Sequence, residues 1–310
     1  MPVPEPAVAY PAWLDREAYP FATRHVTLPA GRMHVVDEGE GPPVVMVHGN
    51  PAWSFLYRHL IQRLRPSHRC VAMDHLGFGL SDKPRGWSYL PEAHAENLEA
   101  LIEGLGLRDV TLVVQDWGGP IGLAYAVAHP ENVARLVIMN SWAWPVDRDP
   151  YYLAFSGFMG GPIGRRLIRR RNFFAQAVMR RAYGDPRRLT PAIHAHYLEA
   201  LPTPGDREGS AVFPRRIVGS TPWLRELAGG LPALADKPAL IVWGMRDIAF
   251  RAKELRRWQS LFPAARTVRL DDVGHYVQEE APERLGDEVA AFLGVGPAPR
   301  ADAAAGTPTT

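Results

Sequence analysis

Residues 113–120 read VVQDWGGP, an apolar run that ends in an aspartate, a tryptophan and two glycines. The run DVTLVV is typical of a buried strand, and GGPIGLAYAVAHP after the aspartate is typical of a helix. Many hydrolases present a nucleophilic serine on such a strand–turn–helix, in the pattern G-x-S-x-G. Asp116 stands where that serine would be, Gly118 keeps the last glycine, and Val114 replaces the first. Asp116 could equally be the N-cap of the following helix.

Short apolar runs alternate with helical patterns on both sides of this stretch, which favours a mostly parallel sheet flanked by helices. TRHVTL and RMHVVDE predict an antiparallel pair, and the further strands are PPVVMVHG, RCVAMD, DVTLVVQD, RLVIMN, PALIVWG and RTVRL. Residues 142–231 show no strand pattern, and RRLIRRRNFFAQAVMRRAYG within them is typical of helix. We therefore expect an α/β core of residues 20–141 and 232–295, with a helical cap (142–231) after the sixth strand. Residues 296–310 are predicted to be disordered.

The composition is that of an ordinary globular protein, with 46% hydrophobic and 22% charged residues among 310. The formal net charge is only +2, so we predict no nucleic-acid or membrane partner. The single cysteine, Cys70, excludes an intrachain disulfide and a thiolate metal cluster. No signal peptide or run of 18 apolar residues is present, which favours a cytoplasmic enzyme; the oligomeric state is not predicted. The arginine-rich run at 165–171 is interpreted as the solvated face of a cap helix.

Three further polar residues follow predicted strands. Asn50 lies in VHGNP, Asp247 in WGMRD and His275 in VGHY. Taken singly, each has an ordinary explanation as a turn, a helix cap or a structural histidine. Loops at the carboxyl ends of parallel strands meet over one site, and the order nucleophile, acid, histidine is that of the α/β-hydrolase fold. The coincidence of these placements favours a catalytic site.

Five blocks of this sequence resemble the haloalkane dehalogenases. They are VHGNPAWSFLYR, MDHLGFGLSDKP, VVQDWGGPIGL, WGMRDIAF and VGHYVQEEAPE, and the resemblance extends over residues 20–293. It implies an α/β-hydrolase core with a helical cap and no cofactor or metal. The implied reaction is hydrolysis of a carbon–halogen bond in a small halogenated substrate, with water as co-substrate and halide as product. The roles it implies are nucleophile for Asp116, base for His275, orienting acid for Asp247, and halide binding for Asn50 and Trp117.

These residue types suit that reaction. A carboxylate can displace halide from a saturated carbon and form an alkyl ester on the enzyme. The indole N–H of Trp117 and the side-chain amide of Asn50 are hydrogen-bond donors for the departing halide. Water activated by His275 can then hydrolyse the ester, with the backbone N–H groups of Asn50 and Trp117 as the oxyanion hole. A serine would form an ether, which water could not hydrolyse in this way.

The position of the acid differs between subfamilies of this resemblance. Some place a glutamate just after the strand RLVIMN, where this chain has Asn-Ser-Trp at 140–142. The acid is therefore predicted to be Asp247. One subfamily uses a second cap tryptophan for halide, but Asn50 favours the asparagine–tryptophan pair. Trp142, Trp144 and Trp223 are candidates for the pocket wall, and His48 is interpreted as a residue that binds backbone beneath the site.

An epoxide hydrolase is the main alternative, because it shares the elbow and the Asp–His–Asp logic. It would need two cap tyrosines to activate the epoxide. The candidates are Tyr151, Tyr152, Tyr183 and Tyr197. Asn50 disfavours this alternative, since a bulky apolar residue is commoner there. A fluoroacetate-type dehalogenase and a non-catalytic hydrolase-like binding protein fit the motifs less well.

Overall fold

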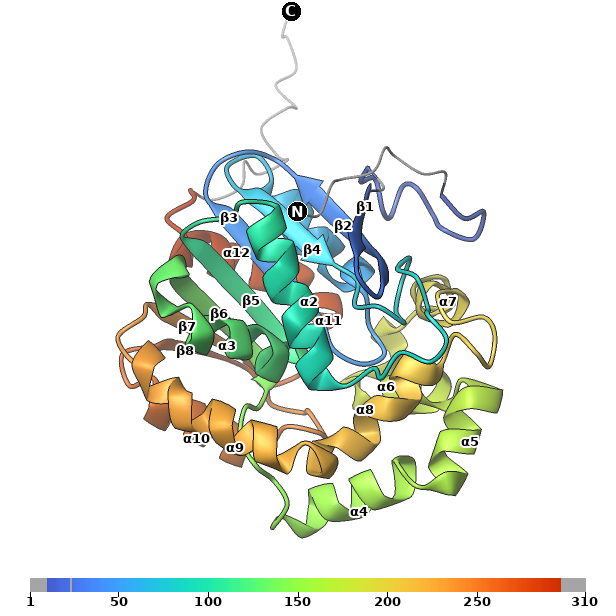
Figure 1. Ribbon diagram of the computed structural model, residues 1–310. Coiled ribbons are helices and arrows are strands. Elements are labelled where there is room, and N and C mark those ends of the chain that lie inside the picture. The colour runs from blue at the N-terminus through green and yellow to red at the C-terminus, as the bar shows by residue number, and fades with distance from the viewer. Residues whose placement is uncertain (1–9, 23, 297–310) are drawn as a thin grey trace, which may run out of the picture.

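The computed structural model describes residues 10–22 and 24–296. Its strands form one sheet in the order β1-β2-β4-β3-β5-β6-β7-β8 (Figure 1). β2 is antiparallel to β1 and β4, and the remaining neighbours are parallel. The strands are β1 (Arg24–Leu28), β2 (Gly31–Glu38), β3 (Pro43–Val47), β4 (Arg69–Met73), β5 (Val110–Asp116), β6 (Val133–Ser141), β7 (Ala239–Gly244) and β8 (Arg266–Leu270). The mostly parallel eight-stranded sheet predicted from the sequence is confirmed.

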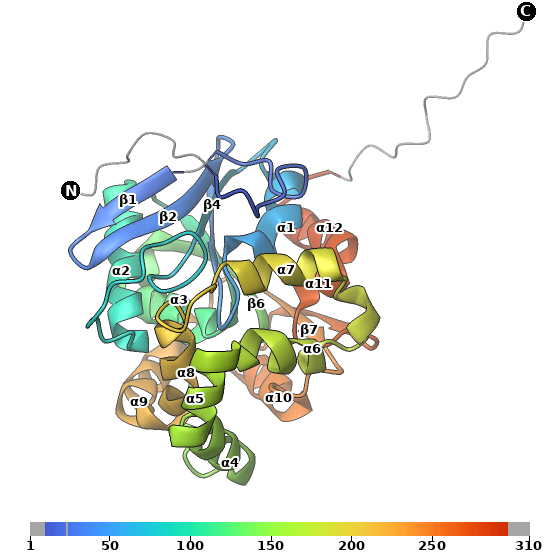
Figure 2. The same cartoon turned by 90° about the vertical axis from the view of Figure 1, so that its right-hand side faces the viewer.

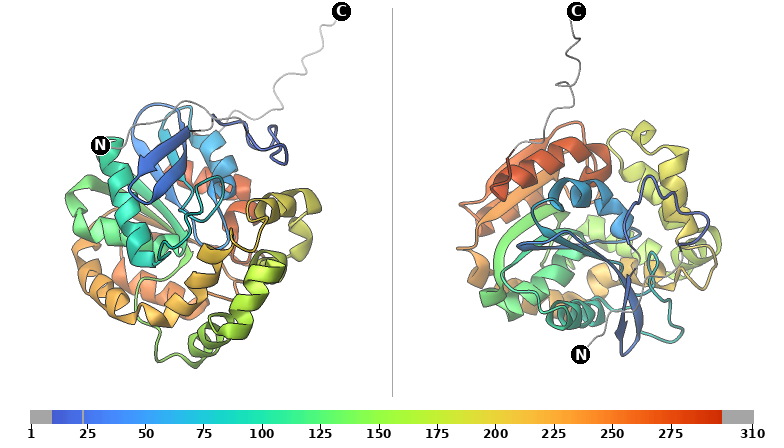
Figure 3. Two further views of the ribbon diagram at one scale, coloured as in Figure 1. Left: turned by 45° about the vertical axis from the view of Figure 1, so that its right-hand side comes forward. Right: turned by 90° about the horizontal axis from the view of Figure 1, so that it is seen from above.

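Helices cover both faces of this sheet, as the view from above shows (right panel of Figure 3). All seven residues of β5 are buried, because a parallel strand inside such a sandwich faces helices on either side. The core helices are α1 (Arg58–Leu64), α2 (Pro91–Gly104), α3 (Gly118–Ala128), α10 (Ala252–Leu261), α11 (Val277–Glu280) and α12 (Pro282–Phe292). α2 and α3 pack together on one face, and α1 and α12 pack together on the other.

A helical cap follows β6, as predicted, and lies over one end of the sheet (Figure 2). Its helices are α4 (Pro150–Met159), α5 (Pro162–Arg171), α6 (Met179–Ala182), α7 (Pro191–Glu199), α8 (Glu208–Gly219) and α9 (Thr221–Gly230). The helical stretch expected around residues 165–184 is interrupted. Asn172 adopts a left-handed φ of 47°, which ends α5, and a π-helical turn (Phe174–Val178) precedes α6.

Buried carboxylates tie the cap to the core. Glu279 of α11 accepts hydrogen bonds from Arg58 of α1 at 2.5 and 2.8 Å and from the hydroxyl of Tyr197 in α7 at 2.5 Å. Its neighbour Glu280 accepts from the backbone N–H of Gly184 in the cap at 2.8 Å and from that of Gly274 in the core at 2.9 Å. Each carboxylate therefore satisfies donors from both parts of the molecule, which fixes the position of the cap on the sheet.

A further buried carboxylate, that of Asp74, holds the loop after β4 in place. Asp74 accepts hydrogen bonds from the backbone N–H groups of Ser54 and Leu80 at 2.7 and 2.8 Å. The His34 ring also lies 2.9 Å from its carboxylate. Despite full burial, the pKa of Asp74 is lowered to about 2, because the His34 charge and these hydrogen bonds favour the carboxylate. Polar contacts to Asp74 therefore fix this loop together with the apolar packing of Leu76 and Phe78 in the core.

No helix within the described ranges is long and apolar enough to cross a membrane. The predicted disordered tail lies outside the described residues, apart from Gly296.

Candidate active site

Asp116 sits on a sharp turn between β5 and α3. Its φ is 51°, a left-handed value that residues with a side chain seldom adopt. The chain around it is packed too closely for a Cβ atom. A Cβ on Gly118 would lie 2.0 Å from the Val47 carbonyl oxygen, and one on Gly119 would lie 1.8 Å from the Ser141 hydroxyl. The glycines after the aspartate are therefore a steric requirement of the turn.

The same packing explains why Val114 can replace the first glycine of the hydrolase pattern. A Cβ on Gly122 of α3 would lie 2.7 Å from Cγ1 of Val114. In the usual pattern the glycine on the strand leaves room for the helix to pack closely. Here the strand carries Val114, and the missing side chain of Gly122 on the helix leaves that room instead. The departure from G-x-S-x-G leaves the close strand–helix packing intact.

The Asp116 carboxylate lies against the loop after β3. The backbone N–H of Asn50 donates to its Oδ2 at 3.2 Å, and the N–H of Trp117 also binds the carboxylate. Gly49 allows this approach, since a Cβ there would lie 2.5 Å from the Asp116 side chain. Burial raises the pKa of the Asp116 carboxyl, although the charge of His275 and the two N–H groups oppose the rise. The carboxylate is thus a buried, weakly solvated anion with two donors aimed at it.

His275 and Asp247, predicted to be partners, are in contact. His275 Nδ1 lies 2.9 Å from Asp247 Oδ2, and the other oxygen of Asp247 accepts from the N–H of Ala249 at 2.6 Å. Burial by itself lowers the pKa of His275, but the charge and hydrogen bond of Asp247, together with the charge of Asp116, raise it above the ordinary value. The pair resembles the acid and base of a hydrolase triad in geometry and electrostatics.

Two residues that contact the pair were not predicted. Asn140, at the end of β6, donates through Nδ2 to Asp247 Oδ2 at 2.8 Å and to the Gly244 carbonyl at 3.0 Å. Gln115 donates through its amide to the His275 carbonyl at 3.2 Å, and the same nitrogen lies 2.7 Å from His275 Nε2. An N–H directed at Nε2 places the imidazole proton on Nδ1, toward Asp247. The sequence offered one sign of these two supporting residues: each is a polar side chain that follows a run of apolar residues in its strand, Gln115 after LVV in β5 and Asn140 after LVIM in β6.

A small buried cavity of about 80 Å³ joins these groups. Asn50, Asp116, Trp117 and His275 all line it, so the structure brings the predicted nucleophile, base and halide-binding residues together. Asp247 stands behind the histidine. The remaining wall is mainly apolar and comes largely from the cap, with Phe155, Phe174, Val178, Pro214 and Ile217.

The two predicted halide donors face this cavity. One amide hydrogen of Asn50 is directed to the Ser210 carbonyl at 3.3 Å, which leaves the other available. The Trp117 indole packs edge-on against Trp142, with ring centroids 4.6 Å apart, and no acceptor in the described chain binds its N–H. Of the three tryptophans proposed for the wall, only Trp142 lines the cavity. Trp144 packs on Trp258 instead.

His48 has the structural role expected of it. Its Nδ1 donates to the Gly49 carbonyl at 2.8 Å, and its Nε2 accepts from the N–H of His75 at 2.9 Å. Burial lowers the pKa of His48 to about 4, so the ring is neutral. Both nitrogens are occupied by backbone, and the ring supports the loop that carries Asn50.

Comparisons with known proteins identify the family of this chain. Residues 42–282 match the α/β-hydrolase fold family. The chain is 42% identical over 273 residues to haloalkane dehalogenase 2 of Mycobacterium tuberculosis, covering 87% of this chain and 94% of that protein. It is 34% identical over 287 residues to a cis-3-alkyl-4-alkyloxetan-2-one decarboxylase of Shewanella oneidensis, covering 88% and 89%.

Among solved structures, the haloalkane dehalogenase DatA from Agrobacterium tumefaciens is similar, with a TM-score of 0.79 and 27% identity over 88% of this chain and 96% of that chain. The chain belongs to the α/β-hydrolase fold family and, within it, to the haloalkane dehalogenases.

Proposed function

We propose that this enzyme hydrolyses haloalkanes through a covalent ester on Asp116. One observation carries the proposal: a buried carboxylate on a strained turn shares a small apolar cavity with two side-chain N–H donors and a paired histidine. In the first step an Asp116 oxygen forms a bond to the carbon, and the carbon–halogen bond breaks with its electrons leaving on the halide. Burial favours this step, because a poorly solvated carboxylate is more reactive than a hydrated one.

The departing halide needs hydrogen bonds, since it develops a negative charge in an apolar cavity. The Trp117 indole N–H and the second amide hydrogen of Asn50 are the donors we assign to it. Both residues flank the Asp116 carboxylate, and their backbone N–H groups already bind it. Preorganised donors of this kind lower the barrier by stabilising charge that appears only in the transition state.

Ester hydrolysis uses the same groups in a second step. We assign to Nε2 of His275 the role of taking a proton from water, which takes the place of the Gln115 amide at that nitrogen and whose oxygen attacks the Asp116 carboxyl carbon. The backbone N–H groups of Asn50 and Trp117 then stabilise the oxyanion. Asp247, held by Asn140, stabilises the resulting imidazolium. The alcohol leaves, Asp116 is regenerated, and the cycle needs no partner besides the halogenated substrate and water.

Epoxide hydrolysis is not favoured. The tyrosine hydroxyls it would require are engaged elsewhere: Tyr151 and Tyr152 donate to the carbonyls of Ile248 and Ala249 at 2.6 and 2.9 Å, and Tyr197 donates to Glu279. Tyr183 has a buried hydroxyl with no partner in the described chain, but it does not line the cavity. The four predicted candidates therefore do not place two free hydroxyls in the cavity for an epoxide oxygen.

Lactone opening is a second candidate, favoured by the identity to the Shewanella oneidensis decarboxylase. In an oxetan-2-one the ring oxygen leaves a saturated carbon as a carboxylate. Attack by Asp116 on that carbon would be the same displacement, and the same two N–H donors would hold the departing carboxylate. Loss of carbon dioxide, with its bonding electrons forming the alkene and expelling Asp116, would complete the reaction without water.

Halide release distinguishes these substrate classes. We expect the purified enzyme to release bromide from 1,2-dibromoethane, measured by ion chromatography, and to leave styrene oxide unchanged. Alkene and carbon dioxide from a cis-3,4-dialkyloxetan-2-one, without halide release from any haloalkane tested, would establish the lactone as the substrate instead.

Substitution of the base should trap the ester. We expect His275→Phe to accumulate a covalent alkyl adduct on the peptide that contains Asp116, because alkylation proceeds while water is no longer activated. Mass spectrometry after incubation with 1,2-dibromoethane checks this. Asp116→Ala/His275→Phe is the control and should carry no adduct. An adduct on another residue, with Asp116 unmodified, would contradict the assignment of the nucleophile.

The halide donors can be tested with a matched pair of tryptophans. Trp117→Phe removes an indole N–H that faces the halide and should lower the rate of ester formation by about a hundredfold or more. Trp142→Phe makes the same chemical change in the same cavity wall, but its N–H is fully buried, so we expect a much smaller loss. Pre-steady-state halide release measures both rates. Equal losses in the two variants would argue against a specific role for Trp117.

The hydrolytic step should fail on acidification. His275 must be neutral to accept a proton, and its pKa lies above the ordinary imidazole value. The rate of ester hydrolysis is therefore expected to fall as the pH drops through the pKa that His275 has in the ester, where Asp247 still raises it and the Asp116 charge no longer does. Asp247→Asn removes the main charge that raises it and should move the midpoint to lower pH. Quenched-flow measurement of ester decay across pH checks this, and an unchanged midpoint in Asp247→Asn would contradict the assigned acid.

A further inference from the structure

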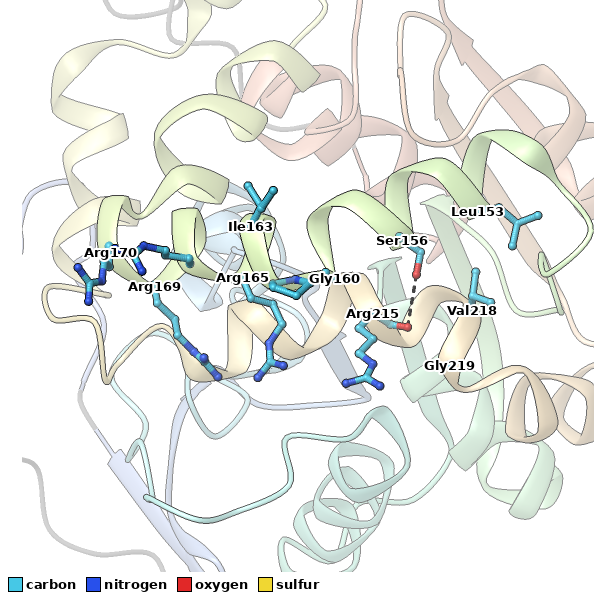
Figure 4. Close-up of a pocket in the computed structure, with 14 residues that line it drawn as sticks. Leu153, Ser156, Gly160, Ile163, Arg165, Arg169, Arg170, Arg215, Val218 and Gly219 are labelled. Atoms are coloured by element: carbon cyan, nitrogen blue, oxygen red, sulfur yellow. Dashed lines mark hydrogen bonds between the residues drawn. The ribbon is translucent and has the colours of Figure 1, made fainter.

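A second and larger depression lies on the outer side of the cap, between α4, α5 and α8 (Figure 4). It is an open groove of about 1100 Å³ and shares no lining residue with the active-site cavity. Its apolar lining includes Leu153, Pro162, Ile163 and Val218. None of the residues assigned to the proposed reaction lies in this groove, so the reaction does not explain the side chains that line it.

Arginines dominate the polar lining. Five line the groove, namely Arg165, Arg166, Arg169, Arg170 and Arg215, and no acidic residue does. In Figure 4 the side chains of Arg165, Arg169 and Arg215 extend to one side of the groove, opposite Ile163. Glu208 pairs with two of them, at 2.5 Å from Arg169 and 3.9 Å from Arg165. Within the described residues the other three have no ion pair, so the groove keeps a strong positive charge.

Exposed apolar side chains adjoin these arginines. Phe158 and Ile163 are 56% and 67% exposed, and Leu153 is 43% exposed. The other large hydrophobic residues exposed in the described ranges are Tyr151 and Ile248, and both line the active-site cavity. The exposed apolar surface thus extends along α4 from the active-site cavity to the start of α5. A helix that is apolar on its outer face as well as its buried face is expected to contact a partner.

The charge indicates what kind of partner fits. A second copy of this chain, docked symmetrically by this face, would bring the five arginines against the same five. An acidic protein or a nucleic acid would satisfy the arginines but leave Phe158 and Ile163 without an apolar environment. A bilayer with anionic headgroups supplies both, with phosphates for the arginines and acyl chains for the apolar side chains.

We propose that the α4–α5 face of the cap, with the arginine groove beside it, docks on the surface of an anionic phospholipid bilayer. The contact is peripheral: Phe158 and Ile163 enter the interface, and Arg166, Arg170 and Arg215 bind lipid phosphates. Tyr151 and Ile248 then place the active-site cavity next to the membrane, where apolar small molecules concentrate. The whole-chain net charge of +2 gave no reason to expect this. The arginines of residues 165–171 do lie on a cap helix and are exposed or partly exposed, and the proposal gives this solvated face a ligand.

Vesicle sedimentation tests the proposal. We expect the full chain to pellet with phosphatidylcholine vesicles that contain phosphatidylglycerol, and not with phosphatidylcholine alone, and to be released as the salt concentration rises. Arg166→Glu/Arg170→Glu should weaken binding by roughly thirtyfold or more. Phe158→Ser/Ile163→Ser keeps the arginines and should also weaken binding. Neither pair contributes to the catalytic cavity, so bromide release in the absence of vesicles should be unchanged and reports correct folding.

A matched control separates local from overall charge. Arg269 of β8 and Arg284 of α12 are exposed and have no ion pair in the described chain, and Arg269→Glu/Arg284→Glu makes the same change in net charge. It should bind vesicles as the unaltered chain does. Equal loss in both arginine variants, or equal binding to neutral and anionic vesicles, would overturn the proposal. So would unaltered binding by Phe158→Ser/Ile163→Ser together with binding to polyglutamate, which would indicate an acidic protein partner.

Discussion

The close approach of three backbone segments around Asp116 is the constraint on which the site depends. The end of β5, the loop after β3 and the start of α3 meet so tightly that Gly49, Gly118 and Gly119 have no room for a Cβ atom. This packing holds Asp116 at a left-handed φ of 51°. It also directs the N–H groups of Asn50 and Trp117 at the carboxylate. A single steric arrangement thus presents the proposed nucleophile and aims at it the two backbone N–H groups that we assign to the oxyanion hole.

Electrostatic coupling across the cavity follows from that geometry. Burial raises the pKa of Asp116, and the neighbouring charge of His275 partly offsets this; in turn the charges of Asp247 and Asp116 raise the pKa of His275. Alkylation of Asp116 removes one of these charges. In the proposed ester, His275 is therefore less readily protonated than in the free enzyme, which suits the role of base that we assign to it. The two proposed steps are linked through the charge of one carboxylate.

The cap both closes the cavity and supports the base. The N–H of His275 donates to the Ala182 carbonyl at 2.9 Å, and Glu280 binds Gly184 and Gly274 from either side. The loop that carries the histidine is thus held by cap backbone as well as by the core. The same cap helices carry apolar and arginine side chains on their outer surface. The cap therefore provides much of the cavity wall, holds the loop of His275 and presents the groove that we propose to bind lipid.

The sequence by itself determined the strands and the residues that end them. Asp116, Asp247 and His275 were predictable because strand periodicity and chain order are local, and parallel strands must bring their carboxyl ends together. Only the tertiary structure decided what those residues touch. Asn140 and Gln115 became visible as supports of the acid and base, Gly122 as the compensation for Val114, and residues 165–170 and 215 as one basic surface. These relations join residues far apart in the chain, and packing and burial, which no local pattern records, bring them into contact.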